Sequence, residues 1–265
     1  MPNATIVHLT VFKSGTVLFR RIIEDLTGLP CFEPAITPGK VDYQDADQLH
    51  CKEGHFYSWH LYPTPAVRKI IMESAAKPVM LLRNIYDLPV SMYYHFAKNI
   101  DAEIGRGRNV EHHFSEISRQ EGLDLIIDGF TKPDFIWPGI GTHLQHMEMM
   151  FTLADEHPSF ITSYERLVSE KQGEVERLAD MLDITVDSQT LSSIVENSRF
   201  DVMKAKAVKN NTASHFRKGT PKSHLTELTT DQIDRVKAIM QQQAPRLEEL
   251  ARRFAFHEIL ECASD

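Results

Sequence analysis

Cysteine is scarce in this sequence, and its three cysteines are far apart. Cys31, Cys51 and Cys262 include no Cys-x-x-Cys pair, so their spacing favours neither a disulfide framework nor a zinc site. No run of eighteen apolar residues is present, and the first residues lack the basic segment and the apolar stretch of a signal peptide. We therefore expect a cytoplasmic protein with free thiols and no membrane partner.

Positive charge is also in short supply. Lys and Arg together number 29 against 37 Asp and Glu, which gives a net charge of −8. Proteins that bind nucleic acid or a membrane surface need a positive field to offset the repulsion between phosphates and acidic side chains. The charge balance therefore argues against a nucleic acid or a membrane surface as the general partner.

Buried strands and amphipathic helices alternate along the chain. Residues 5–12 are β-branched and largely apolar, which is typical of a strand in a parallel sheet, and residues 18–26 have helical spacing. The same patterns predict strands at 56–60, 78–82 and 159–163, helices at 65–75, 84–96, 110–127, 141–155 and 175–182, a basic loop at 204–224, and a last helix that begins with the capping box Thr229-x-x-Gln232. We expect one α/β domain, residues 1–265, with a central parallel β-sheet flanked by helices on both sides, as in P-loop nucleotide-binding proteins.

The segment Lys13-Ser14-Gly15-Thr16 lies between the first strand and the first helix. Its backbone N–H groups, two hydroxyls and one ammonium could hold a phosphate or sulfate at the positive end of the helix dipole. Taken alone, so short a motif is more often a helix cap. It is not a Walker A loop, because no glycine precedes the lysine at the required spacing, and Arg83 stands where a magnesium-binding Asp would end the third strand. A metal-dependent kinase is therefore disfavoured, and no metal is predicted.

Arg83 and Ser91 make a second candidate anion site. Arg83 ends a predicted strand, and parallel sheets present their ligands at the carboxyl ends of their strands. A guanidinium can hold a phosphate through two hydrogen bonds. The alternative is a salt bridge between Arg83 and Asp87 at the start of the helix.

Five segments, in order, resemble landmarks of the sulfotransferases that use 3′-phosphoadenosine 5′-phosphosulfate (PAPS). They are residues 11–16, residues 83–96, Tyr164-Glu165, Phe200-Asp201-x-Met203-Lys204 and residues 216–219. The chain departs from the family pattern at Val17 and Leu18, where Thr and Trp are usual, and at Ser58, where Lys is usual. The resemblance implies a cytosolic-type sulfotransferase domain that transfers a sulfonate from PAPS to a hydroxyl, or an amine, of a small-molecule acceptor, without a metal.

The resemblance also assigns roles to individual residues. Lys13, Ser14, Gly15 and Thr16 would hold the 5′-phosphate and the sulfonate, Arg83, Ser91, Arg217, Lys218 and Gly219 the 3′-phosphate, Tyr164 the adenine edge, and Ser198 and Phe200 the base pocket. Ser58-Trp59-His60-Leu61 matches the stretch that carries the family's catalytic histidine. We therefore expect His60 to be the base and Lys13 to neutralise the leaving phosphate. Without the family context, His60 would be interpreted as a core histidine.

Two other functions stay open at this point. One is a P-loop kinase or phosphotransferase, and the other is a non-catalytic nucleotide-binding protein on the same scaffold. We expect the acceptor pocket to be built from residues 34–60, 97–113 and 130–150, and residues 204–222 to form a lid over the nucleotide. The sequence is compatible with either a monomer or a homodimer.

Overall fold

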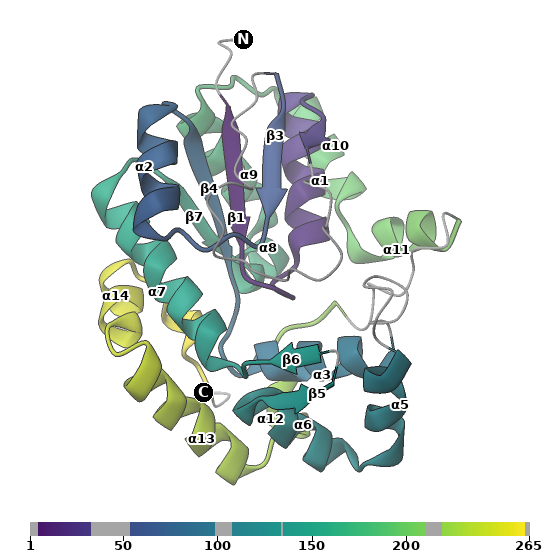
Figure 1. The fold of residues 1–265 in the computed structure, drawn as a ribbon. Helices are drawn as coiled ribbons and strands as arrows, with labels where there is room; N and C mark the ends of the chain where they lie inside the picture. The colour runs from purple at the N-terminus through teal and green to yellow at the C-terminus, as the bar shows by residue number, and fades with distance from the viewer. Residues whose placement is uncertain (1–4, 33–53, 99–107, 134, 210–218, 263–265) are drawn as a thin grey trace. The chain divides into compact units, whose positions relative to one another are not determined.

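The computed structural model of the protein describes residues 5–32, 54–98, 108–133, 135–209 and 219–262 (Figure 1). Contacts within the chain divide it into two compact units. The first unit comprises residues 1–83 and 149–206, and the second comprises residues 84–148 and 207–265. None of the helices in the described ranges is long and apolar enough to cross a membrane.

A five-stranded parallel sheet is the centre of the first unit. Its strand order is β2 (Cys31–Phe32), β3 (Phe56–Trp59), β1 (Ile6–Thr10), β4 (Lys77–Leu82) and β7 (Phe160–Ser163). All four neighbouring pairs of strands are parallel. The predicted α/β class with a central parallel sheet is therefore confirmed, and the two-residue strand β2 is an addition that no periodicity could reveal.

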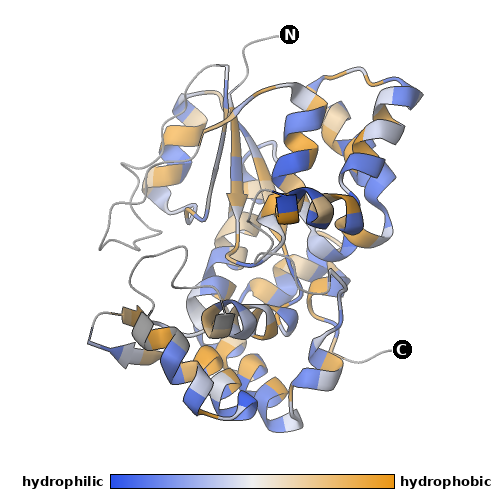
Figure 2. Cartoon of the chain, turned by 90° about the vertical axis from the view of Figure 1, so that its right-hand side faces the viewer, coloured by the Kyte–Doolittle hydropathy of each residue, from blue (hydrophilic) through white to orange (hydrophobic). Residues whose placement is uncertain are grey.

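Helices cover both faces of this sheet. The helices of the first unit are α1 (Thr16–Thr27), α2 (Pro65–Glu73), α8 (Tyr164–Ser169), α9 (Lys171–Leu182), α10 (Ser188–Asn197), residues 149–156 of α7 (Gly141–Glu156) and residues 200–206 of α11 (Phe200–Lys209). Buried side chains of α1, α9 and α10, among them Phe19, Leu178 and Ile194, form one core with the sheet. Figures 1 and 2 show α2 on the opposite face, where its apolar Val67 and Ile71 are buried. Burial of these apolar faces is what drives the helices onto the sheet.

The second unit is mainly helical. It contains α3 (Asp87–Lys98), α5 (Arg108–Glu116), α6 (Arg119–Asp128), the hairpin β5 (Phe130–Lys132) and β6 (Phe135–Trp137), α12 (His224–Glu227), α13 (Thr230–Gln243), α14 (Leu247–Arg253), a short 3-10 helix (His257–Ile259) and the remainder of α7 and α11. Its core includes an aromatic cluster, in which the Phe96 ring centroid lies 4.9 Å from that of Trp137 and 5.9 Å from that of Phe114. His143 stacks on Trp137 with a centroid distance of 5.1 Å.

Three sequence predictions in this part of the chain were wrong. The helix expected at 110–127 is two helices, because the Ser118 hydroxyl accepts from the Glu121 N–H while the Glu121 carboxylate accepts from the Ser118 N–H, a capping box that starts a new helix. The expected last helix is followed by α14, which begins where the Arg246 N–H donates to Glu148. Residues 204–209 of the expected basic loop are helical, as part of α11.

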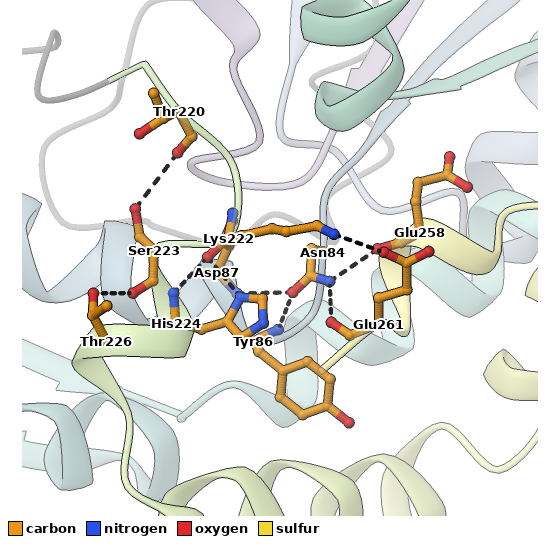
Figure 3. Close-up of polar contacts among 10 residues, drawn as sticks. All are labelled: Asn84, Tyr86, Asp87, Thr220, Lys222, Ser223, His224, Thr226, Glu258 and Glu261. Atoms are coloured by element: carbon orange, nitrogen blue, oxygen red, sulfur yellow. Dashed lines mark hydrogen bonds and ion pairs between the residues drawn. The ribbon is translucent and has the colours of Figure 1, made fainter. Parts of the chain in front are cut away.

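Asn84 organises the start of helix α3 (Figure 3). Its side-chain oxygen accepts hydrogen bonds from the N–H groups of Tyr86 (2.9 Å) and Asp87 (3.1 Å), which satisfies donors at a helix N-terminus. Its amide nitrogen donates to the carbonyl oxygens of Glu258 (2.9 Å) and Glu261 (2.8 Å). Asn84 therefore connects the helix to the C-terminal segment of the second unit.

Asp87 anchors a second segment to the same helix. Its buried carboxylate accepts hydrogen bonds from the N–H groups of Lys222 (2.7 Å) and His224 (2.9 Å) and lies 2.9 Å from the imidazole Nδ1 of His224 (Figure 3). The carboxylate is at the N-terminal end of α3, where the helix dipole favours a negative charge. The chain that leaves the Arg217-Lys218-Gly219 motif is thus fixed to α3 within a few residues.

We predict that Asp87→Asn lowers the free energy of unfolding by about 2–4 kcal/mol, because a buried carboxylate with several charge-assisted hydrogen bonds is replaced by a neutral amide. Urea denaturation measures this loss. Asp231→Asn is the matched control, because Asp231 is 82% exposed in its ion pair with Arg235 and its loss should cost under about 0.5 kcal/mol. Equal losses in the two variants would contradict the role assigned to Asp87.

Candidate functional site

The loop from Val11 to Thr16 has a strained backbone. Lys13 has a φ of 65° and Gly15 a φ of 100°, both in the left-handed region, and the Ser14 N–H closes a tight turn onto the Val11 carbonyl at 3.1 Å. A lysine with positive φ costs of the order of 1 kcal/mol, and such strain is concentrated at ligand sites. The turn places the loop at the N-terminus of α1, where the first N–H groups of a helix have no partner within the helix.

Hydroxyl groups hold this loop in shape. Ser14 is fully buried, and its Oγ donates to the Val11 carbonyl at 2.7 Å. Thr10 Oγ1 lies 2.7 Å from Ser14 Oγ and 3.0 Å from Thr16 Oγ1. Since each hydroxyl has one proton, the bonds run from Thr16 to Thr10, from Thr10 to Ser14, and from Ser14 to the carbonyl. The loop's chemistry toward an anion therefore rests on its backbone N–H groups and on the Lys13 ammonium.

Arg83 and Tyr164 close the other side of the loop. Arg83 follows strand β4, and its Nη1 donates to the Lys13 carbonyl at 2.7 Å. The guanidinium carbon lies 4.7 Å from the centroid of the Tyr164 ring, a cation–π contact. The Nε of Arg83 is buried and has no hydrogen-bond partner among the residues that the structure describes. Tyr164 itself packs so closely on Gly15 that a Cβ atom there would lie 2.5 Å from the tyrosine ring.

His60 has the protonation state that a general base requires. Its Nδ1 is 2.9 Å from the Thr10 carbonyl, which can only accept, so Nδ1 carries the proton and Nε2 carries the lone pair. Burial lowers the pKa of His60 to about 4, the hydrogen bond to Thr10 opposes this shift, and the charges of Arg20 and Lys13 add to it. The imidazole is consequently neutral at physiological pH.

The structure brings four predicted site residues into contact at the carboxyl edge of the sheet, namely Lys13, Gly15, Arg83 and Tyr164. His60 is hydrogen-bonded to the carbonyl of Thr10, at the end of the strand that leads into the Lys13 loop. The other predicted site residues of the first unit are farther along the chain. The Ser198 hydroxyl donates to the Ile194 carbonyl at 2.7 Å, at the end of its own helix α10, and the Ser198 carbonyl accepts from the Lys171 ammonium at 2.7 Å. Phe200 begins α11, where the Lys204 ammonium lies 5.8 Å from its ring centroid.

The remaining predicted site residues belong to the second unit. Ser91 lies within α3, and Gly219 has a φ of 71° at the start of the segment held by Asp87. Arg217 and Lys218 lie outside the described residues, as do residues 34–53 and 99–107 of the expected acceptor pocket and residues 210–218 of the expected lid.

Three residues that contact the site were not predicted from the sequence. Thr10 ends strand β1 and joins the loop to His60, while His8 and Arg20 both contact Ser58, two residues before His60. Strand alternation could have revealed His8 and Thr10, because residues two apart on a strand share a face. No local signal could have identified Arg20 on its helix.

Gly15→Ala should lower the free energy of unfolding by about 2–4 kcal/mol, because the new Cβ meets both an unfavourable φ and the Tyr164 ring. Gly28→Ala is the matched control at the other end of α1, since Gly28 has a φ of 67° but no atom of the described residues lies within 4 Å of the added Cβ. That variant should lose only about 1 kcal/mol. Urea unfolding of both variants tests the close contact between Gly15 and Tyr164. The prediction is refuted if Gly15→Ala is no less stable than Gly28→Ala.

Known proteins of similar sequence are sulfotransferases. A mouse (Mus musculus) protein, Sulfotransferase 1B1, is 26% identical over 190 residues, which cover 66% of this chain and 57% of the relative. A human (Homo sapiens) protein, Sulfotransferase 2B1, is 26% identical over 194 residues, which cover 67% of this chain and 47% of the relative. The chain thus spans about half the length of these curated relatives.

Solved structures share the fold. A mouse sulfotransferase, SULT7A1, complexed with PAP superimposes with a TM-score of 0.67 at 16% identity, covering 95% of this chain and 89% of that chain. Retinol dehydratase in complex with androsterone and the inactive cofactor PAP gives a TM-score of 0.58 at 15% identity, covering 92% and 81%. The family described as "Sulfotransferase domain" matches residues 5–250. The family predicted from five short segments is therefore confirmed, and this chain belongs to the sulfotransferase domain family.

Proposed function

We propose that this protein transfers a sulfonate group from PAPS to a hydroxyl, or an amine, of a small-molecule acceptor. The observation that carries the proposal is the arrangement of the strained Lys13 loop, Arg83 and a neutral His60 at one edge of the parallel sheet. Support also comes from the relatives, since the similar solved structures contain PAP, and those of retinol dehydratase contain androsterone or retinol as well.

The residues present fit a phosphosulfate nucleotide. The N-terminus of α1 offers backbone N–H groups and a positive dipole end, and Arg83 has a buried Nε that no described residue pairs with. Gly15 lacks a side chain where one would displace Tyr164. We assign the 5′-phosphate and sulfonate to Lys13, Ser14, Gly15 and Thr16, mainly through the backbone.

The other ligand contacts follow the family pattern. We assign the 3′-phosphate to Arg83, Ser91, Arg217, Lys218 and Gly219, the adenine edge to Tyr164, and the base pocket to Ser198 and Phe200. The single domain over residues 1–265, the cytoplasmic location and the choice between monomer and homodimer stay predictions.

The mechanism uses His60 as a base and Lys13 as a fixed cation. When bound, PAPS would supply an activated sulfonate. His60 Nε2 takes the proton of the acceptor hydroxyl as its oxygen forms a bond to sulfur, while the bond from sulfur to the bridging phosphate oxygen breaks. Lys13 stabilises the negative charge that develops on that bridging oxygen, at no cost of reorganisation because the loop is already held. The Thr10 carbonyl stabilises the imidazolium through Nδ1–H.

Isothermal titration calorimetry with adenosine 3′,5′-bisphosphate tests the binding site. We expect wild-type protein to bind the nucleotide without magnesium, and the double variant Lys13→Ala/Arg83→Ala to bind at least about 100-fold more weakly, since two charge-assisted contacts are lost. Lys69→Ala is the control for loss of a lysine, because Lys69 is 73% exposed and pairs with Glu73. Failure of the wild type to bind, or binding that survives the double substitution, would overturn the proposal.

The same proposal predicts the behaviour of His60→Ala. Turnover should fall by about 10² to 10⁴ while nucleotide affinity changes less than about twofold, because a general base acts only in the chemical step. In the wild type, kcat/KM should decline as the pH drops through the pKa of about 4, since the base must be unprotonated. His112→Ala is the control, because His112 is 72% exposed. Turnover equal to that of the wild type would remove His60 as the base.

Magnesium separates this function from the kinase alternative. A kinase should need magnesium and should transfer from ATP, whereas the proposed reaction should proceed from PAPS in the presence of a chelator. Phosphoryl transfer from ATP that depends on magnesium would favour the kinase.

A further inference from the structure

A buried polar group lies at the end of β3 that leads to His60. His8 on β1 is the register partner of Ser58 on β3. His8 and Thr10 are two residues apart on β1 and share a face, and Ser58 lies two residues before His60, which follows the end of β3. Helix α1, which follows the Lys13 loop, contributes Arg20 to this group.

The contacts of Ser58 fix the direction of its proton. Arg20 donates from both Nε and Nη2 to Ser58 Oγ, each at 3.3 Å, and His8 Nδ1 lies 2.8 Å from the same oxygen. A guanidinium can only donate, so the Ser58 hydroxyl is left to donate to His8 Nδ1. His8 and Ser58 are fully buried. His8 is therefore a neutral imidazole whose accepting nitrogen is occupied.

The charge of Arg20 acts on both histidines. Burial lowers the pKa of His8 well below its ordinary value, and the positive charge of Arg20 lowers it further. For His60, burial is again the largest cause, and Arg20 acts in the same direction as Lys13. Besides Arg20 on α1, the groups close to His60 include Lys13 on the loop, the titratable His8 on β1, the Thr10 carbonyl and the ring of Phe12 at 5.3 Å. Of the two cations that lower the pKa of His60, Arg20 belongs to helix α1 and Lys13 belongs to the loop.

We propose that Arg20 is a positioning residue for the transfer reaction: its guanidinium secures the Ser58 end of β3, two residues before His60, and holds a positive charge close to the imidazole that serves as the base. The catalytic part of this statement rests on the proposed function of His60. After the imidazole has taken the acceptor's proton, repulsion from Arg20 and Lys13 favours release of that proton to water, which restores the base.

The charge effect can be measured without any turnover. An NMR titration of ¹⁵N-labelled imidazoles follows the pKa of His60, assigned by the signal lost in His60→Gln. Arg20→Met should raise this pKa by about half a unit or more, because a nearby positive charge is removed from a site of low dielectric. Arg20→Lys keeps the charge and should leave the pKa within about 0.3 units of the wild type.

Arg21→Met is the matched control, because the neighbouring Arg21 pairs with Asp25 at 2.7 Å. It should leave the His60 titration unchanged. An unchanged pKa in Arg20→Met, or an equal rise in Arg21→Met, would overturn the proposal. If Arg20→Met fails to fold by circular dichroism, Arg20→Gln also removes the charge and must give the same rise.

Activity then tests the catalytic part. In Arg20→Met the acid limb of kcat/KM should move to higher pH by the same amount as the NMR pKa, and Arg20→Lys should restore its position. A limb that stays in place while the NMR pKa moves would show that Arg20 acts on His60 but not on the reaction. A wild type that neither binds adenosine 3′,5′-bisphosphate nor transfers sulfonate would refute the proposed function alone, since the NMR result decides the role of Arg20 independently.

Discussion

The end of strand β1 at Thr10 is the constraint on which the site depends. Its carbonyl accepts a hydrogen bond from the Nδ1–H of His60, and its hydroxyl connects Thr16 with Ser14. One residue therefore fixes both the tautomer of His60 and the shape of the Lys13 loop. Each of these bonds contributes only about 1 kcal/mol, but leaving any of these buried groups unpaired would cost more than that. The hydrogen bonds of Thr10 therefore specify the geometry of the site, although they add little to the net stability of the fold.

The site separates two tasks between two kinds of group. Hydroxyl groups on short side chains stabilise the Lys13 loop through hydrogen bonds within it. Lys13, Arg83 and Arg20 supply full positive charges around that loop. The positive φ of Lys13 is tolerated because Arg83 donates to the Lys13 carbonyl and so secures the strained residue. This concentration of cations lies in a chain whose net charge is −8. Net charge thus argues against an extended polyanion as the general partner, but it does not describe the electrostatic field at the site.

Local pattern accounts for most of the fold. Strands β1, β4 and β7 and the long helices could be predicted, because burial of an apolar face imposes a period of two or 3.6 on the residues themselves. Prediction failed where short-range polar bonds override that period. The capping box at Ser118 and Glu121 divides one apolar run into two helices, and the hairpin at residues 130–137 is too short to show alternation.

The sequence by itself determined the family and pointed to the Lys13 loop, Arg83 and His60 as candidate site residues, because these lie at the ends of strands whose order along the chain carries a recognisable pattern. Tertiary structure decided what each of these groups contacts. It turned the Ser14 hydroxyl inward, pressed Tyr164 onto Gly15, and brought Arg20 beside Ser58. These contacts join residues separated by 38 or more positions, or depend on the strained φ values of one turn. Neither the long-range contacts nor the φ values of the turn produce a periodic pattern in the sequence, because they form only when the helices pack on the sheet.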